Sequence, residues 1–210
     1  MIKYVIFDFD GTLADSQEVF IKSWNQLAKK NNFKEVKMDE LDTLKKISIK
    51  ERCNLLNFPM YKMPLIVPQM YKQLQRLMSE ISLFDGIRDM LNQLEVEGYK
   101  TAIISSNSKD NILSFLDKNQ ITNVTDVHCS SSIFGKDKLI NKFLKNHHLN
   151  PAEVIYVGDE ERDVVACKKT GVKIIWVSWG YDSVDVIVNE QPDYKVDKPS
   201  QILEMLSGKN

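Results

Sequence analysis

The sequence lacks long hydrophobic runs and has only three cysteines, and both shortages exclude classes of protein. Nothing in the 210 residues approaches the roughly eighteen consecutive apolar residues of a membrane-spanning helix. Asp8 and Asp10 interrupt the apolar stretch near the N-terminus before it could form the core of a secretion signal. Cys53, Cys129 and Cys167 are widely spaced and form no Cys-x-x-Cys pair, which argues against a disulfide framework or a zinc site. We therefore expect a cytoplasmic protein without a membrane partner.

An excess of charge of either sign is also missing. Lys and Arg total 28 against 29 Asp and Glu, so no overall field attracts nucleic acid or an anionic membrane. Hydrophobic residues make up 43% of the chain, which is enough for the core of one or two domains. A small charged metabolite is a better partner for such a protein than nucleic acid, and we expect a monomer or a weak homodimer.

The most informative stretch is residues 3–12, KYVIFDFDGT. Its apolar, β-branched and aromatic first half predicts a buried strand, yet Asp8 and Asp10 follow directly. In extended chain these two side chains leave on one face, where their repulsion has to be offset by a cation, so the pair indicates a metal site. Gly11 permits a sharp turn, and Thr12 adds a hydroxyl and a backbone N–H that can hold an anion.

Residues from Asp15 to about Ser82 have helical periodicity. We predict helices capped by Ser16 and by Asp39, a third over 49–56 and a fourth over 65–81, with a linker over 59–64. An insertion of this size is too long for an ordinary crossover between two strands of a sheet. We therefore expect it to form a cap over the edge of the sheet.

From residue 83 onward, helices and strands alternate. We expect strands over 99–104, 125–129, 154–157, 172–177 and near Tyr194. The helices between them are expected over 87–97, 109–119, 137–148, 163–170 and from Pro199, with a loop over 130–135. Right-handed crossovers then give an α/β fold with a doubly wound parallel sheet. The predicted domains are a catalytic core, residues 1–15 and 83–210, and an all-helical cap, residues 16–82.

Three polar clusters follow predicted strands: Asp8 with Asp10, Ser105, and Asp159 with Asp163. The carboxyl ends of parallel strands meet at one edge of the sheet, so we expect these clusters to share one crevice. Glu160 and Glu161 are explained by the acidic start of a helix, which the helix dipole favours.

Asp-Phe-Asp-Gly-Thr at residues 8–12 resembles the nucleophile motif of the haloacid dehalogenase-like hydrolases. Ser105 and the Gly-Asp-x-x-x-Asp pattern at residues 158–163 resemble the second and fourth motifs of that superfamily. Motif order, spacing and the helical insertion are similar to its phosphoglycolate phosphatase-like and phosphoglucomutase-like branch. The resemblance implies a Rossmann-like core and a Mg²⁺-dependent phosphatase that hydrolyses a small phosphorylated metabolite, a phosphomonoester, through an aspartyl-phosphate.

The same resemblance implies the roles of individual residues. Asp8 is the expected nucleophile, and Asp10 is the expected general acid and base. The implied metal ligands are Asp8, the Asp10 carbonyl and Asp159, with Asp163 as a further ligand or orienting group. The implied phosphate-binding residues are Gly11, Thr12, Ser105, Ser106, Asn107 and a lysine. Lys136 is preferred for that lysine because it lies on the loop side of its helix after Gly135, whereas Lys138 lies inside the first turn.

Three questions stay open at this stage. A phosphosugar mutase would use the same residues and return the phosphoryl group to the sugar. A non-enzymatic protein that kept the fold would be expected to lose Asp8, Asp10 or Asp159, and all three are present. Substrate choice is not implied, because the cap stretch at residues 45–48, Lys-Lys-Ile-Ser, departs from the Arg-Gly turn of the branch.

Overall fold

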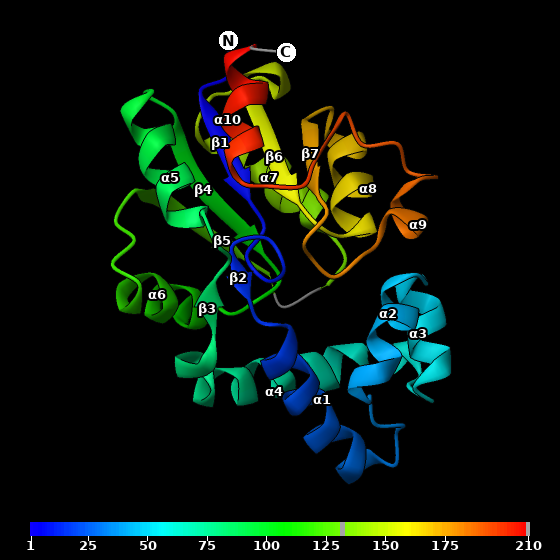
Figure 1. Cartoon of the computed structure of the whole chain (residues 1–210). Coiled ribbons are helices and arrows are strands. Elements are labelled where there is room, and N and C mark those ends of the chain that lie inside the picture. The colour runs from blue at the N-terminus through cyan, green and yellow to red at the C-terminus, as the bar shows by residue number, and fades with distance from the viewer. Residues whose placement is uncertain (131–132, 209–210) are drawn as a thin grey trace.

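The computed structural model describes residues 1–130 and 133–208. Within these residues, a six-stranded parallel sheet has the order β5-β4-β1-β6-β7-β8, with β1 near its centre (Figure 1). The strands are β1 (Tyr4–Phe7), β4 (Lys100–Ser105), β5 (Val124–Cys129), β6 (Val154–Gly158), β7 (Lys173–Val177) and β8 (Tyr194–Val196). Each strand of this sheet lies where the sequence predicts one, with bounds that differ by a residue or two.

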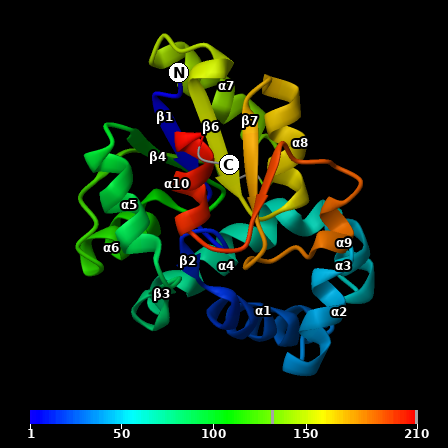
Figure 2. The ribbon, with the colours of Figure 1, turned by 45° about the horizontal axis from the view of Figure 1, so that its top comes forward.

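Helices cover both faces of the sheet. Val5 and Phe7 of β1 belong to a hydrophobic cluster on one face, which includes α5 (Ile87–Val96), α6 (Lys109–Lys118) and α10 (Ser200–Ser207). Tyr4 and Ile6 belong to the cluster on the other face, which includes α7 (Lys136–Asn146), α8 (Glu161–Thr170) and α9 (Val184–Ile187). All four β1 residues are buried, which explains the continuous apolar run. Figure 2 shows the same two helical layers, and the predicted α/β fold class is confirmed.

The helical insertion, residues 16–81, lies beyond the carboxyl ends of the central strands (Figure 1). Its α-helices are α1 (Gln17–Asn31), α2 (Leu41–Lys45), α3 (Ile49–Leu55) and α4 (Met63–Arg76). Short 3-10 helices are Met38–Glu40, Met60–Lys62 and Met78–Glu80, and a further one in the core is Pro151–Glu153. Two short antiparallel strands, β2 (Ala14–Asp15) and β3 (Ser82–Leu83), connect the insertion to the sheet.

Several local predictions in the insertion are wrong. The expected linker over 59–64 is instead a 3-10 helix, Met60–Lys62, followed by the start of α4. Pro64 is compatible with that start, because it falls in the first turn of α4, where its missing N–H removes no hydrogen bond. Asp39 lies within a 3-10 helix and does not cap one. Ser16 does precede α1, but its hydroxyl makes no cap hydrogen bond and donates to Asp10 instead.

The expected loop over 130–135 includes residues 131–132, which lie outside the described residues. In the part of the chain that is described, no helix is both long and apolar enough to cross a membrane.

Candidate active site

The strands β1, β4 and β6 bring the three predicted polar clusters to one edge of the sheet, facing the helical insertion. Asp8, Ser105 and Asp159 are each at most 1% exposed, and Asp10 is 6% exposed. Gly11 turns the chain after β1 with a φ of 78°, and a Cβ at this position would lie 2.3 Å from Oδ2 of Asp159. Only glycine therefore fits between the turn and that carboxylate.

Lys136 lies in the middle of the buried carboxylates. Its Nζ donates to Oδ2 of Asp8 at 2.6 Å and also to Oδ1 of Asp163. Burial alone would lower the pKa of Lys136, but the carboxylates of Asp163 and Asp8 outweigh burial and raise the pKa above its usual value. Gly135, with a φ of 107°, precedes Lys136 at the start of α7, and Lys138 is exposed. Of the two candidate lysines, the structure brings Lys136 to Asp8.

Three carboxylates form a group that could hold a cation. Oxygens of Asp8, Glu160 and Asp163 lie within 4.8 Å of one another. Burial raises the pKa of Asp163 to about 7, although Lys136 opposes this rise. An oxygen-only set of buried carboxylates suits a hard cation such as Mg²⁺, so the residues present fit the predicted metal.

Glu160 is a member of this group that the sequence analysis assigned only to a helix start. It does precede α8, and its Oε2 also accepts from Nε of Arg162 at 2.7 Å. Burial opposes ionisation of Glu160, but Arg162 and Lys136 together lower its pKa. The helix-start explanation and the cluster explanation therefore both apply to Glu160.

Asp10 is held by two side chains. Its Oδ1 accepts from Oγ of Ser16 at 2.7 Å and its Oδ2 from Nδ2 of Asn107 at 2.8 Å. Burial raises the pKa of Asp10 to about 6, with the hydrogen bond from Ser16 opposing the rise. A carboxyl with a pKa near neutrality can both give and take a proton, as a general acid and base must.

Asp159 has both oxygens occupied by donors. Oδ1 accepts from Oγ1 of Thr12 at 2.8 Å, and Oδ2 accepts from the backbone N–H of Tyr181 at 2.7 Å. Burial, followed by the neighbouring charges of Glu160 and Asp8, raises the pKa of Asp159 well above its usual value. Thr12 was expected to bind the phosphate, but in this structure its hydroxyl donates to Asp159.

The other predicted phosphate-binding residues lie at the same edge. Oγ of Ser105 accepts from the backbone N–H of Asn107 at 3.1 Å. Oγ of Ser106 lies 2.9 Å from the hydroxyl of Tyr71 and accepts from Nη1 of Arg162 at 3.2 Å. Asn107 is thus close to Asp10, and Ser106 is close to the half-buried guanidinium of Arg162.

Arg162 and Tyr71 were missed in the sequence analysis. Tyr71 comes from α4 in the helical insertion and carried no signal, since it falls on the apolar stripe of that helix. Arg162 did carry one, because a cation in the first turn of a helix is disfavoured by the helix dipole and calls for an anionic partner. Glu160 is that partner here.

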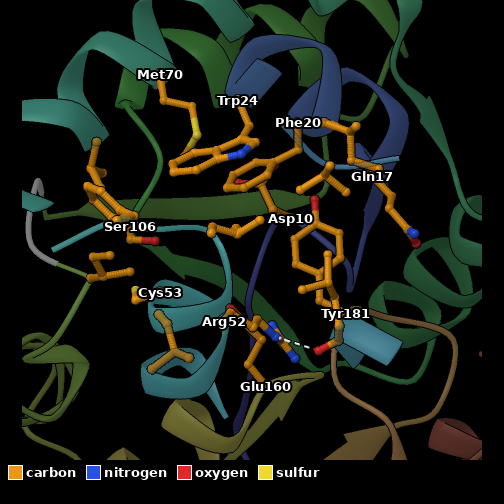
Figure 3. Close-up of a pocket in the computed structure, with 18 of the residues that line it drawn as sticks. Asp10, Gln17, Phe20, Trp24, Arg52, Cys53, Met70, Ser106, Glu160 and Tyr181 are labelled. Atoms are coloured by element: carbon orange, nitrogen blue, oxygen red, sulfur yellow. Dashed lines mark hydrogen bonds between the residues drawn. The ribbon is translucent and has the colours of Figure 1, made fainter. Parts of the chain in front are cut away.

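A cavity of about 210 Å³ opens between this edge and the helical insertion (Figure 3). Asp8, Asp10, Ser106, Glu160 and Arg162 line its core side. Side chains from α1, α2, α3 and α4 line the opposite side, and Phe20, Trp24 and Met70 are among those labelled in Figure 3. A small substrate could therefore contact the carboxylates and the insertion at once.

Comparisons with known proteins agree with this arrangement. The family model described as haloacid dehalogenase-like hydrolase matches residues 5–177. A phosphoglycolate phosphatase of Synechococcus elongatus is 28% identical over 204 residues, covering 97% of this chain and 96% of its own. A pyrophosphatase PpaX of Bacillus mycoides is 25% identical, covering 98% of this chain and 97% of its own.

Solved structures share the fold. A haloacid dehalogenase-like hydrolase from Streptococcus pneumoniae superposes with a TM-score of 0.81 at 22% identity, and the match covers 98% of each chain. The fold similarity therefore extends over the sheet and the helical insertion together.

Proposed function

Because the chain belongs to the haloacid dehalogenase-like hydrolase family, we propose that it is a Mg²⁺-dependent phosphatase that acts on small phosphomonoesters through an aspartyl-phosphate on Asp8. Family membership confirms the resemblance found in the sequence. The names of similar proteins, a phosphoglycolate phosphatase and a pyrophosphatase, agree with the predicted class of hydrolase. The observation that carries the proposal is the contact between Lys136 and Asp8 in a buried cluster of carboxylates.

In the proposed mechanism, an oxygen of Asp8 attacks the phosphorus of the ester. An O–P bond to Asp8 forms while the bond from phosphorus to the alcohol oxygen breaks. Oδ1 of Asp8 accepts from the backbone N–H of Phe9 at 2.7 Å, and Oδ2 accepts from Lys136, so both oxygens have a fixed direction. This preorganisation lowers the cost of reaching an in-line geometry.

Asp10 is the proposed proton carrier for both half-reactions. In its protonated form it gives a proton to the departing alkoxide, and in the resulting ionised form it takes one from the water that attacks the aspartyl-phosphate. The water oxygen then bonds to phosphorus, Asp8 leaves as a carboxylate, and Asp10 regains its proton. The hydrogen bonds from Ser16 and Asn107 hold Asp10 in one orientation for both steps.

The proposed metal ligands remain Asp8, the carbonyl of Asp10, Asp159 and Asp163, and Glu160 is added because its carboxylate joins the group. Bound Mg²⁺ supplies positive charge that lets a phosphate dianion approach these carboxylates. Lys136 and Arg162 contribute the protein's own positive charge at this edge.

We also propose that residues 16–82 act as a cap domain on a core of residues 1–15 and 83–210. The short strands β2 and β3 form the connection, and Arg52 of α3 pairs with Asp182 of the core on a second path between the two parts. Opening admits substrate and closing excludes water from the first half-reaction. Cytoplasmic location and a monomeric or weakly dimeric state stay predictions.

Phosphate release from a panel of phosphomonoesters, with Mg²⁺ and after chelation, tests the proposed function. We expect inorganic phosphate to be released with Mg²⁺, to stop in excess EDTA, and to resume when Mg²⁺ is restored. Full turnover in excess EDTA would overturn the metal assignment. Conversion of a sugar phosphate to its isomer with little phosphate released would instead identify a mutase.

A further inference from the structure

Most of the cavity above Asp8 and Asp10 is lined by apolar side chains. They come from every α-helix of the insertion, so the apolar lining is a property of the whole insertion and not of one exposed residue. They include Phe20, Trp24, Leu44, Cys53, Val67 and Met70. Figure 3 shows Phe20, Trp24 and Met70 around the same space above Asp10.

Both guanidinium groups of the cavity are already engaged, and Lys45 of α2 is the remaining cationic side chain in its lining. Arg52 pairs with Asp182 and also donates from Nε to the carbonyl of Leu44 at 2.7 Å. Arg162 pairs with Glu160 at the sheet edge. Among Phe20, Trp24 and Met70, a second carboxylate or several hydroxyls on a substrate would have to leave water for an apolar surface, which is costly without new hydrogen bonds.

We propose, resting on the phosphatase function above, that the substrate is the phosphate monoester of an apolar alcohol, with its aliphatic or aromatic group among Phe20, Trp24 and Met70. The phosphoryl group lies at Asp8, where the polar lining is gathered. The cavity of about 210 Å³ has room for a short alkyl chain or one aromatic ring beside the phosphoryl group.

The position of the cavity indicates that it is a binding site and not a packing defect. A void inside the insertion would be enclosed by its helices alone, whereas this cavity also has Asp8, Asp10 and Tyr181 of the core in its wall. An apolar group bound there contacts the insertion and the core together. Its burial therefore favours the closed form, in which the reacting groups are shielded from water.

A series of n-alkyl phosphates from ethyl to octyl, each assayed with Mg²⁺ alongside phosphoglycolate and pyrophosphate, tests this proposal. We expect kcat/KM to rise roughly threefold for each added methylene, so that hexyl phosphate exceeds ethyl phosphate by about 80-fold, and to level off once the alkyl chain fills the cavity. Phosphoglycolate and pyrophosphate should fall well below hexyl phosphate.

The outcomes distinguish the two proposals. Equal kcat/KM along the series, or preference for phosphoglycolate or pyrophosphate, overturns the apolar substrate and leaves the phosphatase function intact. Failure to release phosphate from any compound overturns the phosphatase function itself.

A pair of variants on α3 locates the effect in the cavity. Cys53 lines the cavity, whereas Leu55, two residues later, is 42% exposed and lies outside the lining. Cys53→Phe should lower the ratio of kcat/KM for hexyl over ethyl phosphate by about tenfold or more, because the ring occupies the space of the alkyl chain. Leu55→Phe should leave that ratio unchanged. An unchanged ratio in folded Cys53→Phe would place the alkyl group elsewhere.

Discussion

The ammonium nitrogen of Lys136 lies 2.6 Å from Oδ2 of Asp8, and each of the two side chains is 2% exposed. The same nitrogen also donates to Asp163, so one buried cation is shared by two carboxylates, one directly after β1 and one in α8. In a site from which water is excluded, such a cation acts strongly on any charge that develops nearby. Lys136 is therefore placed to balance the charge of the proposed nucleophile and of the phosphoryl group.

Lys136→Ala should lower kcat by about 100-fold, because a positioned cation in a water-poor site contributes roughly 3 kcal/mol to transition-state stabilisation. Lys138→Ala is the matched control, since Lys138 is two residues away and exposed. Steady-state kinetics of both variants, with circular dichroism to check folding, measures the difference. A larger loss for Lys138→Ala, or mild losses for both, would contradict the role of Lys136.

Stabilisation by Mg²⁺ should depend on pH. Burial raises the pKa of Asp10 to about 6 and that of Asp163 to about 7, from an ordinary value of 3.8. Because these pKa values are raised in the folded state, the protonated carboxyls favour folding below about pH 4, and this contribution is lost as the pH rises to 6 and 7. Mg²⁺ binds the ionised carboxylate of Asp163, together with those of Asp8 and Glu160, and so offsets the part of that loss that comes from Asp163.

The Mg²⁺ concentration is set to 100 times the dissociation constant at pH 8. We expect Mg²⁺ at this concentration to add about 2.7 kcal/mol to the free energy of unfolding at pH 8 and much less at pH 5. Thermal or urea unfolding with Mg²⁺ and with EDTA at the two pH values measures the effect. Equal stabilisation at both pH values would show that the ion does not bind this cluster.

The contact between Arg52 and Asp182 should control closure of the insertion. Asp182 is 5% exposed, accepts from the backbone N–H of Glu161 at 2.7 Å, and lies outside the cavity lining. Asp182→Asn removes the charge that holds Arg52 without changing the cavity wall. We expect KM to rise about tenfold with a smaller change in kcat, since loss of a buried pair costs more than loss of an exposed one.

Asp185→Asn is the matched control for that experiment, because Asp185 is exposed and three residues away. Limited proteolysis at the β2 and β3 connections gives a second readout. Unchanged KM and unchanged cleavage in Asp182→Asn would mean that the pair does not hold the insertion closed.

The sequence predicted the fold well because the core depends on simple patterns. The apolar run before Asp8 could only be a strand covered on both faces. The alternation of helices and strands after residue 83 required those strands to pair in parallel. Strand ends then brought Asp8, Ser105 and Asp159 to one edge without any knowledge of side-chain contacts. Helix bounds near Pro64 were harder, since proline is compatible with both a linker and a first helical turn.

The sequence could not predict which side chains would meet across the edge. Glu160 lies in an acidic helix start that has an adequate local explanation, so nothing marked its part in the cluster, whereas Arg162, a cation in the same helix start, did indicate an anionic partner. Tyr71 and Ser16 reach the site from the helical insertion, and their contacts depend on how that insertion sits on the core. The apolar cavity depends on the same placement, because its lining residues look like ordinary core residues in each helix separately.

The covalent intermediate on Asp8 gives the most direct test of the account. Turnover with a phosphomonoester is stopped by acid after a few milliseconds, and the peptide containing Asp8 is analysed by mass spectrometry. We predict the added mass of one phosphoryl group on that peptide, removable by hydroxylamine, in the unchanged protein and in the control variant Asp39→Asn, whose side chain is exposed. Asp8→Asn should carry no such mass and should release no phosphate. Phosphate release by Asp8→Asn at the rate of the unchanged protein, or a phosphoryl group on another residue, would contradict the central claim.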